Sequence, residues 1–125
     1  MTPEETLRWL TGLRNLGSRL GVERMRLLAA RLGHPERAAP CLHVAGTNGK
    51  GSVCAMIEAI QRAHGRRTGL YTSPHLVAIG ERIQVGRVPL ADAAVVAHAE
   101  RLRPHYEAIR AADPEAAPTF FELIT

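Results

Sequence analysis

Residues 46–52, Gly-Thr-Asn-Gly-Lys-Gly-Ser, are the segment whose residue types and spacing are best suited to chemistry. The glycines let the backbone adopt conformations closed to other residues and come close to phosphate oxygens. Lys50 adds a mobile positive charge, and a hydroxyl of Thr47 or Ser52 can serve a phosphate or a magnesium ion. Lys50 is also the chain's single lysine, beside fifteen arginines. The segment therefore predicts a phosphate-binding loop for a nucleoside triphosphate.

The loop departs from the common G-x-x-x-x-G-K-[ST] pattern in two ways. Gly46 lies four residues before the lysine instead of six, and Gly51 separates Lys50 from Ser52. This short loop with a displaced serine disfavours a P-loop kinase. A tight turn without a ligand is the alternative interpretation, and the elements on either side of the loop argue against it.

The loop lies between segments that predict a strand and a helix. Residues 41–45 form a short apolar run typical of a buried strand, and residues 68–72 predict a second strand. Residues 52–64 predict a helix whose inward face carries Val53, Met56, Ile57 and Ile60. Strand, loop, helix and strand in this order indicate a βαβ unit with parallel strands. Such a unit places the loop's N–H groups at the positive end of a helix dipole.

Further helical patterns lie on both sides of this unit. Helices are predicted over residues 3–15, 22–32, 90–112 and 119–125. Pro104 should break or kink the third of them, whereas Thr119 and Glu122 have the spacing of a capping box. Residues 82–85 alternate as in a third strand. We expect an α/β fold, a three-layer parallel sheet with flanking helices, in which two N-terminal helices precede the first strand.

Composition excludes several classes of protein. Hydrophobic residues make up 46% of the chain and aromatic residues 4%, enough for an aliphatic core. The net charge is +4, but the arginines are scattered without interleaved aromatic residues, so no nucleic-acid surface is expected. No apolar run approaches the roughly 18 residues of a membrane span, and the acidic start lacks a secretory signal. We expect a cytoplasmic protein that binds small molecules and neither nucleic acid nor membrane.

The two cysteines, Cys41 and Cys54, stand alone in the sequence. Their spacing suits neither a zinc knuckle nor a disulfide framework. We expect both thiols to be buried as small hydrophobic groups.

Four segments, in this order and spacing, carry a family resemblance. They are residues 20–25, 43–52, 69–76 with 81–83, and 119–122. Together they resemble the folylpolyglutamate synthase/dihydrofolate synthase branch of the Mur-ligase superfamily. Cell-wall Mur ligases favour a Gly-Thr-x-Gly-Lys-Thr loop, whereas Asn48 and Gly51 favour the folate branch. Residues Ile79-Gly80 depart from the family pattern, and Gly80 should make the loop 77–82 more mobile.

The resemblance implies an ATP-dependent ligase that joins L-glutamate to dihydropteroate or (tetrahydro)folate through an acyl phosphate, with ATP and Mg²⁺. Residues 1–125 would be the N-terminal part of its ATP-binding domain, with the rest of that domain and the glutamate-ligase domain lying beyond them. The parent is expected to be a monomer. The 125 residues alone are expected to be inactive and to self-associate through an uncovered sheet. Two alternatives stay open: another Mur-type amide ligase acting on a UDP-muropeptide, and a non-catalytic nucleotide-binding module.

The resemblance also assigns site residues. Those expected at the ATP phosphates are Gly46, Thr47, Asn48, Gly49, Lys50, Gly51 and Ser52, with Lys50 as the stabilising charge. Those expected at Mg²⁺ are Ser73 and Ser52. Those expected at the pterin or folate are Thr119, Phe120, Phe121, Glu122, Ser18, Arg19, Leu20, His75 and Arg82. A plain turn at Ser73 and a capping role for Glu122 are the alternatives. The family's other Mg²⁺ ligands, a glutamate and a histidine, are expected beyond Thr125.

Overall fold

The computed structural model describes residues 1–17, 19–75 and 77–125. The chain divides into two compact units. The first consists of Met1–Pro40 and Val96–Thr125, and the second of Cys41–Val95. The boundary between Val95 and Val96 falls inside helix α4, Asp92–Ala112.

The first unit is helical. Its elements are α1 (Pro3–Gly12), η1 (Leu13–Leu16), α2 (Glu23–Arg31), η2 (Pro35–Arg37), most of α4, η4 (Pro114–Ala116) and α5 (Phe120–Ile124). A capping box starts α1: Thr2 Oγ1 accepts from the Glu5 N–H, and the Glu5 carboxylate accepts from the Thr2 N–H. The helices predicted over residues 3–15 and 22–32 are confirmed to within a few residues.

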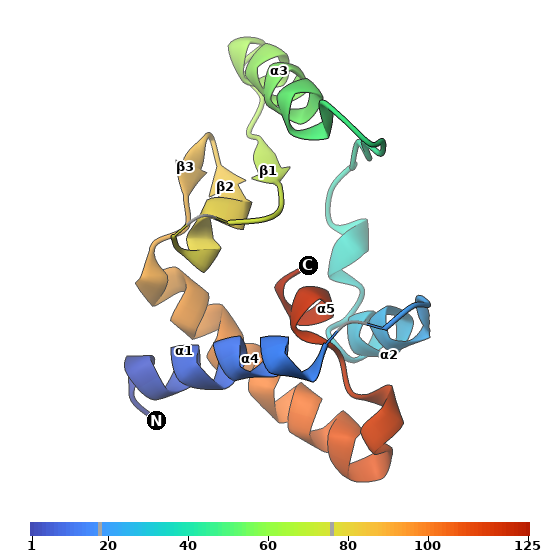
Figure 1. Ribbon diagram of the computed structural model, residues 1–125. Helices are drawn as coiled ribbons and strands as arrows, with labels where there is room; N and C mark the ends of the chain where they lie inside the picture. The colour runs from blue at the N-terminus through green and yellow to red at the C-terminus, as the bar shows by residue number, and fades with distance from the viewer. Residues whose placement is uncertain (18, 76) are drawn as a thin grey trace. The chain divides into compact units, whose positions relative to one another are not determined.

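Helix α1 lies across α4 (Figure 1). Thr6 Oγ1 donates to Glu100 Oε1 at 3.3 Å, and the rings of Trp9 and Tyr106 meet edge-on with centroids 5.5 Å apart. The buried apolar side chains of this unit include Leu10, Leu13, Leu28, Tyr106, Ile109, Phe120 and Leu123. Burying each such side chain contributes about 1.5–3 kcal/mol, so the aliphatic composition suffices for a core.

Helix α4 continues through Pro104, where the sequence predicted a break or a kink. Proline lacks the N–H that would bond the Glu100 carbonyl, and an interior proline costs about 3 kcal/mol or more. Ala99, Tyr106 and Ile109 are buried on either side of it. Packing along the helix therefore offsets the local cost, because tertiary contacts supply most of the stability of a helix.

The second unit combines a helix with a small sheet. Its elements are α3 (Lys50–Ala63), β1 (Gly69–Tyr71), η3 (Ile79–Arg82), β2 (Ile83–Val85), β3 (Val88–Pro89) and the start of α4. The strands lie in the order β1-β2-β3, and both pairings are antiparallel. Gly86 and Arg87 join β2 to β3 with φ of 57° and 69°, the two positive φ values that a type I′ hairpin turn needs.

The parallel pairing of residues 41–45 with 68–72 was a wrong prediction for the described chain. Residues 41–45 form no strand there, and β1 pairs with β2 instead. Parallel strands are stable where both faces of the sheet are covered, but Leu42 is 72% exposed. Antiparallel strands need no crossover helix between them, so β2, which follows β1 after residues 72–82, becomes its partner.

Gly80 is buried in η3 and does not form the mobile loop that was expected there. The presence of glycine has another reason. A Cβ added at Gly80 would lie 1.9 Å from the carbonyl oxygen of Leu90. The Leu90 N–H donates to the carbonyl of Gly80 at 3.2 Å and to that of Ile83 at 2.9 Å. The glycine is needed because two backbone segments meet here without room for a side chain.

Two expectations about burial are also corrected. Cys41 is exposed and Cys54 is half-buried. Val53, Met56 and Ile60 on α3, expected to face inward, are 41%, 57% and 55% exposed. Within the described residues α3 packs against β1, and nothing there covers this apolar face. No helix in the described part of the chain is long and apolar enough to cross a membrane.

Candidate functional site

The glycine loop leads directly into helix α3. Gly46 has a φ of 155°, and Gly49, the residue before the helix, is left-handed with φ 75° and ψ 6°. The helix begins at Lys50, two residues before the predicted start, and its first bond runs from the Val53 N–H to the Gly49 carbonyl at 3.0 Å. The N–H groups of Lys50, Gly51 and Ser52 precede this bond, so no carbonyl of the helix accepts from them.

The Lys50 side chain lies close to the start of the loop. A Cβ added at Gly46 would be 4.0 Å from Lys50 Cγ. Residues 46–52 are all exposed, and within residues 1–17, 19–75 and 77–125 Lys50 has no hydrogen-bond or ion-pair partner. The loop thus offers an anion three N–H groups, the positive end of a helix dipole and one ammonium group.

A buried carboxylate, Glu58, fastens α3 to the sheet. Glu58 Oε1 accepts from Arg62 Nε at 2.9 Å and from Thr68 Oγ1 at 2.8 Å, while Arg87 Nη1 lies 3.6 Å from Oε2. Burial by itself raises the pKa of Glu58, but the hydrogen bonds from Arg62 and Thr68 and the charges of Arg62 and Arg87 outweigh it and hold the pKa below its ordinary value. This anchor was not predicted from the sequence. Its local signal was the Glu58–Arg62 pair at helical spacing.

This pKa makes stability depend on pH. Because the folded-state pKa of Glu58 is lowered, its contribution is complete above the unfolded-state pKa and is lost as pH falls through the folded-state pKa. We expect the thermal midpoint of the full-length gene product to fall between about pH 5 and pH 3. The Glu58→Gln variant should start lower at neutral pH and lose less on acidification, whereas Glu107→Gln, an exposed control, should follow wild type. Scanning calorimetry at several pH values tests this, and parallel curves for wild type and Glu58→Gln would contradict it.

The segment after β1 brings together two of the predicted substrate residues. Arg82 Nε donates to His75 Nδ1 at 2.7 Å, so this ring nitrogen carries no proton. Arg82 is buried, and its carbonyl accepts from the Thr72 N–H at 2.9 Å. Ser73 is exposed, and its peptide bond to Pro74 is cis. These residues belong to the same unit as the phosphate loop.

The segment 119–122 lies in the other unit, at the start of α5. Its capping box is confirmed: Thr119 Oγ1 accepts from the Glu122 N–H at 3.2 Å, and Glu122 Oε1 accepts from the Thr119 N–H at 2.9 Å. Phe120 is buried, with the Arg14 guanidinium 5.5 Å from its ring centroid, whereas Phe121 is 48% exposed. Of the two aromatic rings, Phe121 is therefore the accessible one.

Arg24 links this segment to residues 19 and 20. Arg24 Nε donates to Glu122 Oε1 at 2.8 Å, and Nη2 donates to the carbonyls of Arg19 at 2.9 Å and Leu20 at 3.3 Å. Burial by itself raises the pKa of Glu122, but Arg24 and the Thr119 N–H hold it below its ordinary value. Arg24 was not predicted as a site residue, although it lies in segment 20–25, which carries part of the family resemblance.

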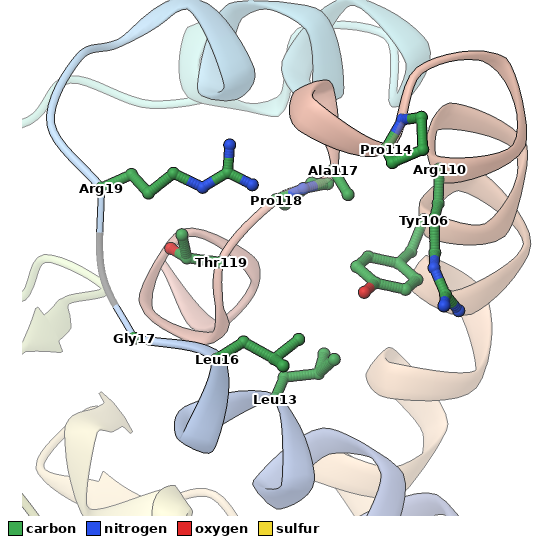
Figure 2. A pocket seen from close by; sticks show the side chains of 10 residues that line it. All are labelled: Leu13, Leu16, Gly17, Arg19, Tyr106, Arg110, Pro114, Ala117, Pro118 and Thr119. Carbon is green, nitrogen blue, oxygen red and sulfur yellow. The ribbon is translucent and has the colours of Figure 1, made fainter.

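A pocket opens between η1 and the approach to α5 (Figure 2). Arg19 extends into it towards the segment before α5, where its Nη1 donates to the carbonyl and Oε2 of Glu115 at 2.8 and 3.0 Å. The residues that line it are Leu13, Leu16, Gly17, Arg19, Tyr106, Arg110, Pro114, Ala117, Pro118 and Thr119. Two of the predicted pterin residues, Arg19 and Thr119, thus meet at one pocket. Leu20 is 99% exposed and does not line the pocket, and Ser18 lies outside the described residues.

Metal ligands of the usual kinds do not gather in the described residues. No three histidine, cysteine, aspartate or glutamate side chains there are placed to hold one ion. The oxygen donors predicted for Mg²⁺ are the exposed hydroxyl groups of Ser52 and Ser73. Hydroxyl oxygens suit a hard cation that keeps much of its water.

Known proteins resemble this chain in both sequence and structure. It is 40% identical over 117 residues to the dihydrofolate synthase/folylpolyglutamate synthase of Bacillus subtilis, a match covering 94% of this chain and 27% of that protein. It superimposes on the folylpolyglutamate synthase of Thermotoga maritima with a TM-score of 0.87 and 34% identity, over 98% of this chain and 28% of that one. The chain is a homologue of the folylpolyglutamate/dihydrofolate synthases. No family model matches it.

The homology confirms the expected fold class, that of the N-terminal domain of these Mur-type ligases. The chain spans about a quarter of the length of these two relatives. A folylpolyglutamate synthase of Mycobacterium tuberculosis, solved in complex with ADP, has a TM-score of 0.85 at 33% identity, over 98% of this chain and 28% of that one.

Proposed function

We propose that these residues belong to an ATP-dependent ligase that joins L-glutamate to dihydropteroate or (tetrahydro)folate. The observation that carries the proposal is the loop at the start of α3, where Gly49 is left-handed, three N–H groups lack intrahelical acceptors and Lys50 is unpaired among the described residues. A solved folylpolyglutamate synthase in complex with AMPPCP and folate matches 99% of this chain with a TM-score of 0.85. That relative pairs a triphosphate analogue with a folate, which favours the same substrates here.

In this mechanism the loop 46–52 binds the triphosphate of ATP. The N–H groups of Lys50, Gly51 and Ser52 donate to phosphate oxygens, and the Lys50 ammonium offsets the charge that spreads over the transferred phosphoryl group. A carboxylate of the pteroate or folate attacks the γ-phosphorus, giving an acyl phosphate and ADP. The amine of L-glutamate then attacks the acyl carbon, so that the amide forms, inorganic phosphate leaves and the amine loses a proton. The protein's part is positioning and charge stabilisation.

The hydroxyl groups of Ser73 and Ser52 would provide protein oxygens for Mg²⁺. When bound, the ion neutralises phosphate charge. The further ligands that we propose for this ion, a glutamate and a histidine, would lie beyond Thr125.

For the pterin we propose the pocket lined by Arg19 and Thr119, together with the exposed Phe121 ring two residues after Thr119. The aromatic ring of Phe121 and the polar groups of Arg19 and Thr119 suit a flat heterocycle whose nitrogens form hydrogen bonds. Glu122 is bonded to Arg24 and to the capping N–H, which favours its structural role over direct contact with the pterin. His75 and Arg82, which follow β1, remain proposed contacts to the pterin or folate substrate.

For residues 1–125 alone we infer nucleotide binding without ligase turnover, because they span about a quarter of the relatives' length. The exposed apolar face of α3 favours self-association of this piece. The parent is proposed to be a monomeric cytoplasmic enzyme.

The proposed function is tested by ADP release from the full-length gene product, with and without L-glutamate. Dihydropteroate, tetrahydrofolate and a UDP-linked muropeptide are offered separately as acceptors. We expect glutamate-dependent release with one or both pterin substrates. Turnover with the muropeptide alone would reassign the protein to the cell-wall ligases, and ATP binding without turnover would leave a nucleotide-binding module. Robust glutamate-dependent turnover by residues 1–125 alone would contradict the inference that this piece is inactive.

A further inference from the structure

Arg24 joins two segments that lie 98 residues apart in the sequence. One arm of its guanidinium binds Glu122, and the other binds the carbonyls of Arg19 and Leu20. Because a guanidinium is planar and rigid, its donors hold these acceptors at fixed positions relative to one another. Arg24 therefore sets the spacing between the loop before α2 and the first turn of α5.

Both segments contribute side chains to the pocket in Figure 2: Arg19 comes from the loop before α2, and Thr119 from the start of α5. The Thr119 N–H and Arg24 Nε share the same oxygen, Glu122 Oε1. Losing Arg24 would release the Arg19 main chain and leave the Glu122 carboxylate, which the capping box keeps beside Thr119, without its link to the loop before α2.

Arg24 is placed to act through its neighbours and not on a ligand. Its side chain is 13% exposed and that of Glu122 is 8% exposed. The nitrogens Nε and Nη2 already donate to protein oxygens. A group this enclosed can change binding at the pocket by moving the residues that line it.

We propose that Arg24 is a positioning residue for the pterin-bearing substrate. It holds Arg19 and Thr119 at the separation that this substrate requires and takes no part in binding ATP. The assignment rests on the proposed function for the nature of the substrate, whereas the tether itself does not depend on it.

The kinetic test compares KM for dihydropteroate or tetrahydrofolate with KM for ATP in the full-length gene product. For Arg24→Met we expect KM for the pterin substrate to rise at least about tenfold, because a misplacement of about 1 Å can cost up to about a hundredfold. KM for ATP should change less than about twofold. Arg24→Lys should lie between, since one ammonium cannot hold all three acceptors as the fork does.

Two further variants separate positioning from stability. Arg24→Met leaves Glu122 as an unpaired buried charge, which is destabilising, whereas Arg24→Met/Glu122→Gln removes that charge and keeps a residue suited to the capping box. We expect the double variant to regain thermal stability but to retain the raised KM for the pterin substrate. Arg26→Met breaks the exposed pair between Arg26 and Glu23, 2.7 Å apart on the same helix, and should change neither KM.

The proposal would be overturned if the KM for ATP rose in parallel with the KM for the pterin substrate. It would also be overturned if both KM values returned to those of wild type in the double variant. Unchanged kinetics in Arg24→Met would overturn it as well. Hydrogen–deuterium exchange of the same variants supplies a readout that needs no substrate: Arg24→Met should speed exchange in residues 15–21 and 118–123, and unchanged exchange would also overturn the tether. Wild-type protein inactive on both pterin substrates would reject the proposed function, while the exchange result would still decide whether Arg24 holds the two segments.

Discussion

Replacing Lys50 by methionine is expected to lower kcat/KM for ATP at least about a hundredfold, since a preorganised group that stabilises transition-state charge is worth about 10²–10³ in rate. Methionine keeps the unbranched stem that passes near Gly46 and removes the charge. Residues 1–125 contain no other lysine. Steady-state ADP release by the full-length gene product, measured over a range of ATP concentrations, gives the result.

The matched control is Arg67→Met, which removes an exposed positive charge from the same unit at a position after α3. Its kcat/KM should stay within about twofold of wild type, because an exposed charge outside the site contributes little. If Lys50→Met kept wild-type kcat/KM, or if both variants lost activity equally, the role assigned to Lys50 would be wrong.

The second large effect is expected on folding. Gly80→Ala places a methyl group 1.9 Å from the Leu90 carbonyl oxygen, far inside van der Waals contact. The hydrogen bonds from the Leu90 N–H hold the backbone of Gly80 against that of Leu90. The clash can therefore be relieved only if η3 moves away from the chain before α4. We expect a loss of more than about 3 kcal/mol in the free energy of unfolding, at the upper end for an overpacked site. Scanning calorimetry and the yield of soluble protein measure it.

Gly69→Ala is the control for Gly80→Ala. A Cβ there would meet its nearest neighbour, the Gln84 carbonyl oxygen, at 3.9 Å, an ordinary contact. Its thermal midpoint should stay close to that of wild type. A Gly80→Ala variant as stable as Gly69→Ala would show that the close approach between Gly80 and Leu90 does not exist in solution.

The features that the sequence predicted correctly are those encoded by near neighbours. The capping box of Thr119 and Glu122 acts over three residues, and its helix starts where the pattern put it. The glycines before Lys50 likewise signal left-handed backbone locally, as Gly49 confirms. Such signals depend on a few consecutive residues, so they can be found without tertiary information.

Features that depend on distant contacts were missed. The 41–45 segment has the composition of a buried strand, but a strand forms only where a partner and cover are present, and β1 pairs with β2 instead. Arg24 and Glu122 are 98 residues apart, so nothing in either neighbourhood signals their contact. The role of Gly80 could not be predicted for the same reason: a glycine is needed there because the Leu90 backbone comes close, and not because the loop must be flexible.

The central claim is that the N–H groups at the start of α3 bind the phosphates of ATP. Hydrogen–deuterium exchange of the full-length gene product with and without Mg²⁺ and AMPPCP tests it most directly, because amides without an acceptor exchange quickly until a ligand protects them. We predict slower exchange in peptides that contain residues 46–53, and little change in residues 119–125 with nucleotide alone. Unchanged exchange in residues 46–53, under conditions where calorimetry shows the nucleotide to be bound, would contradict the claim.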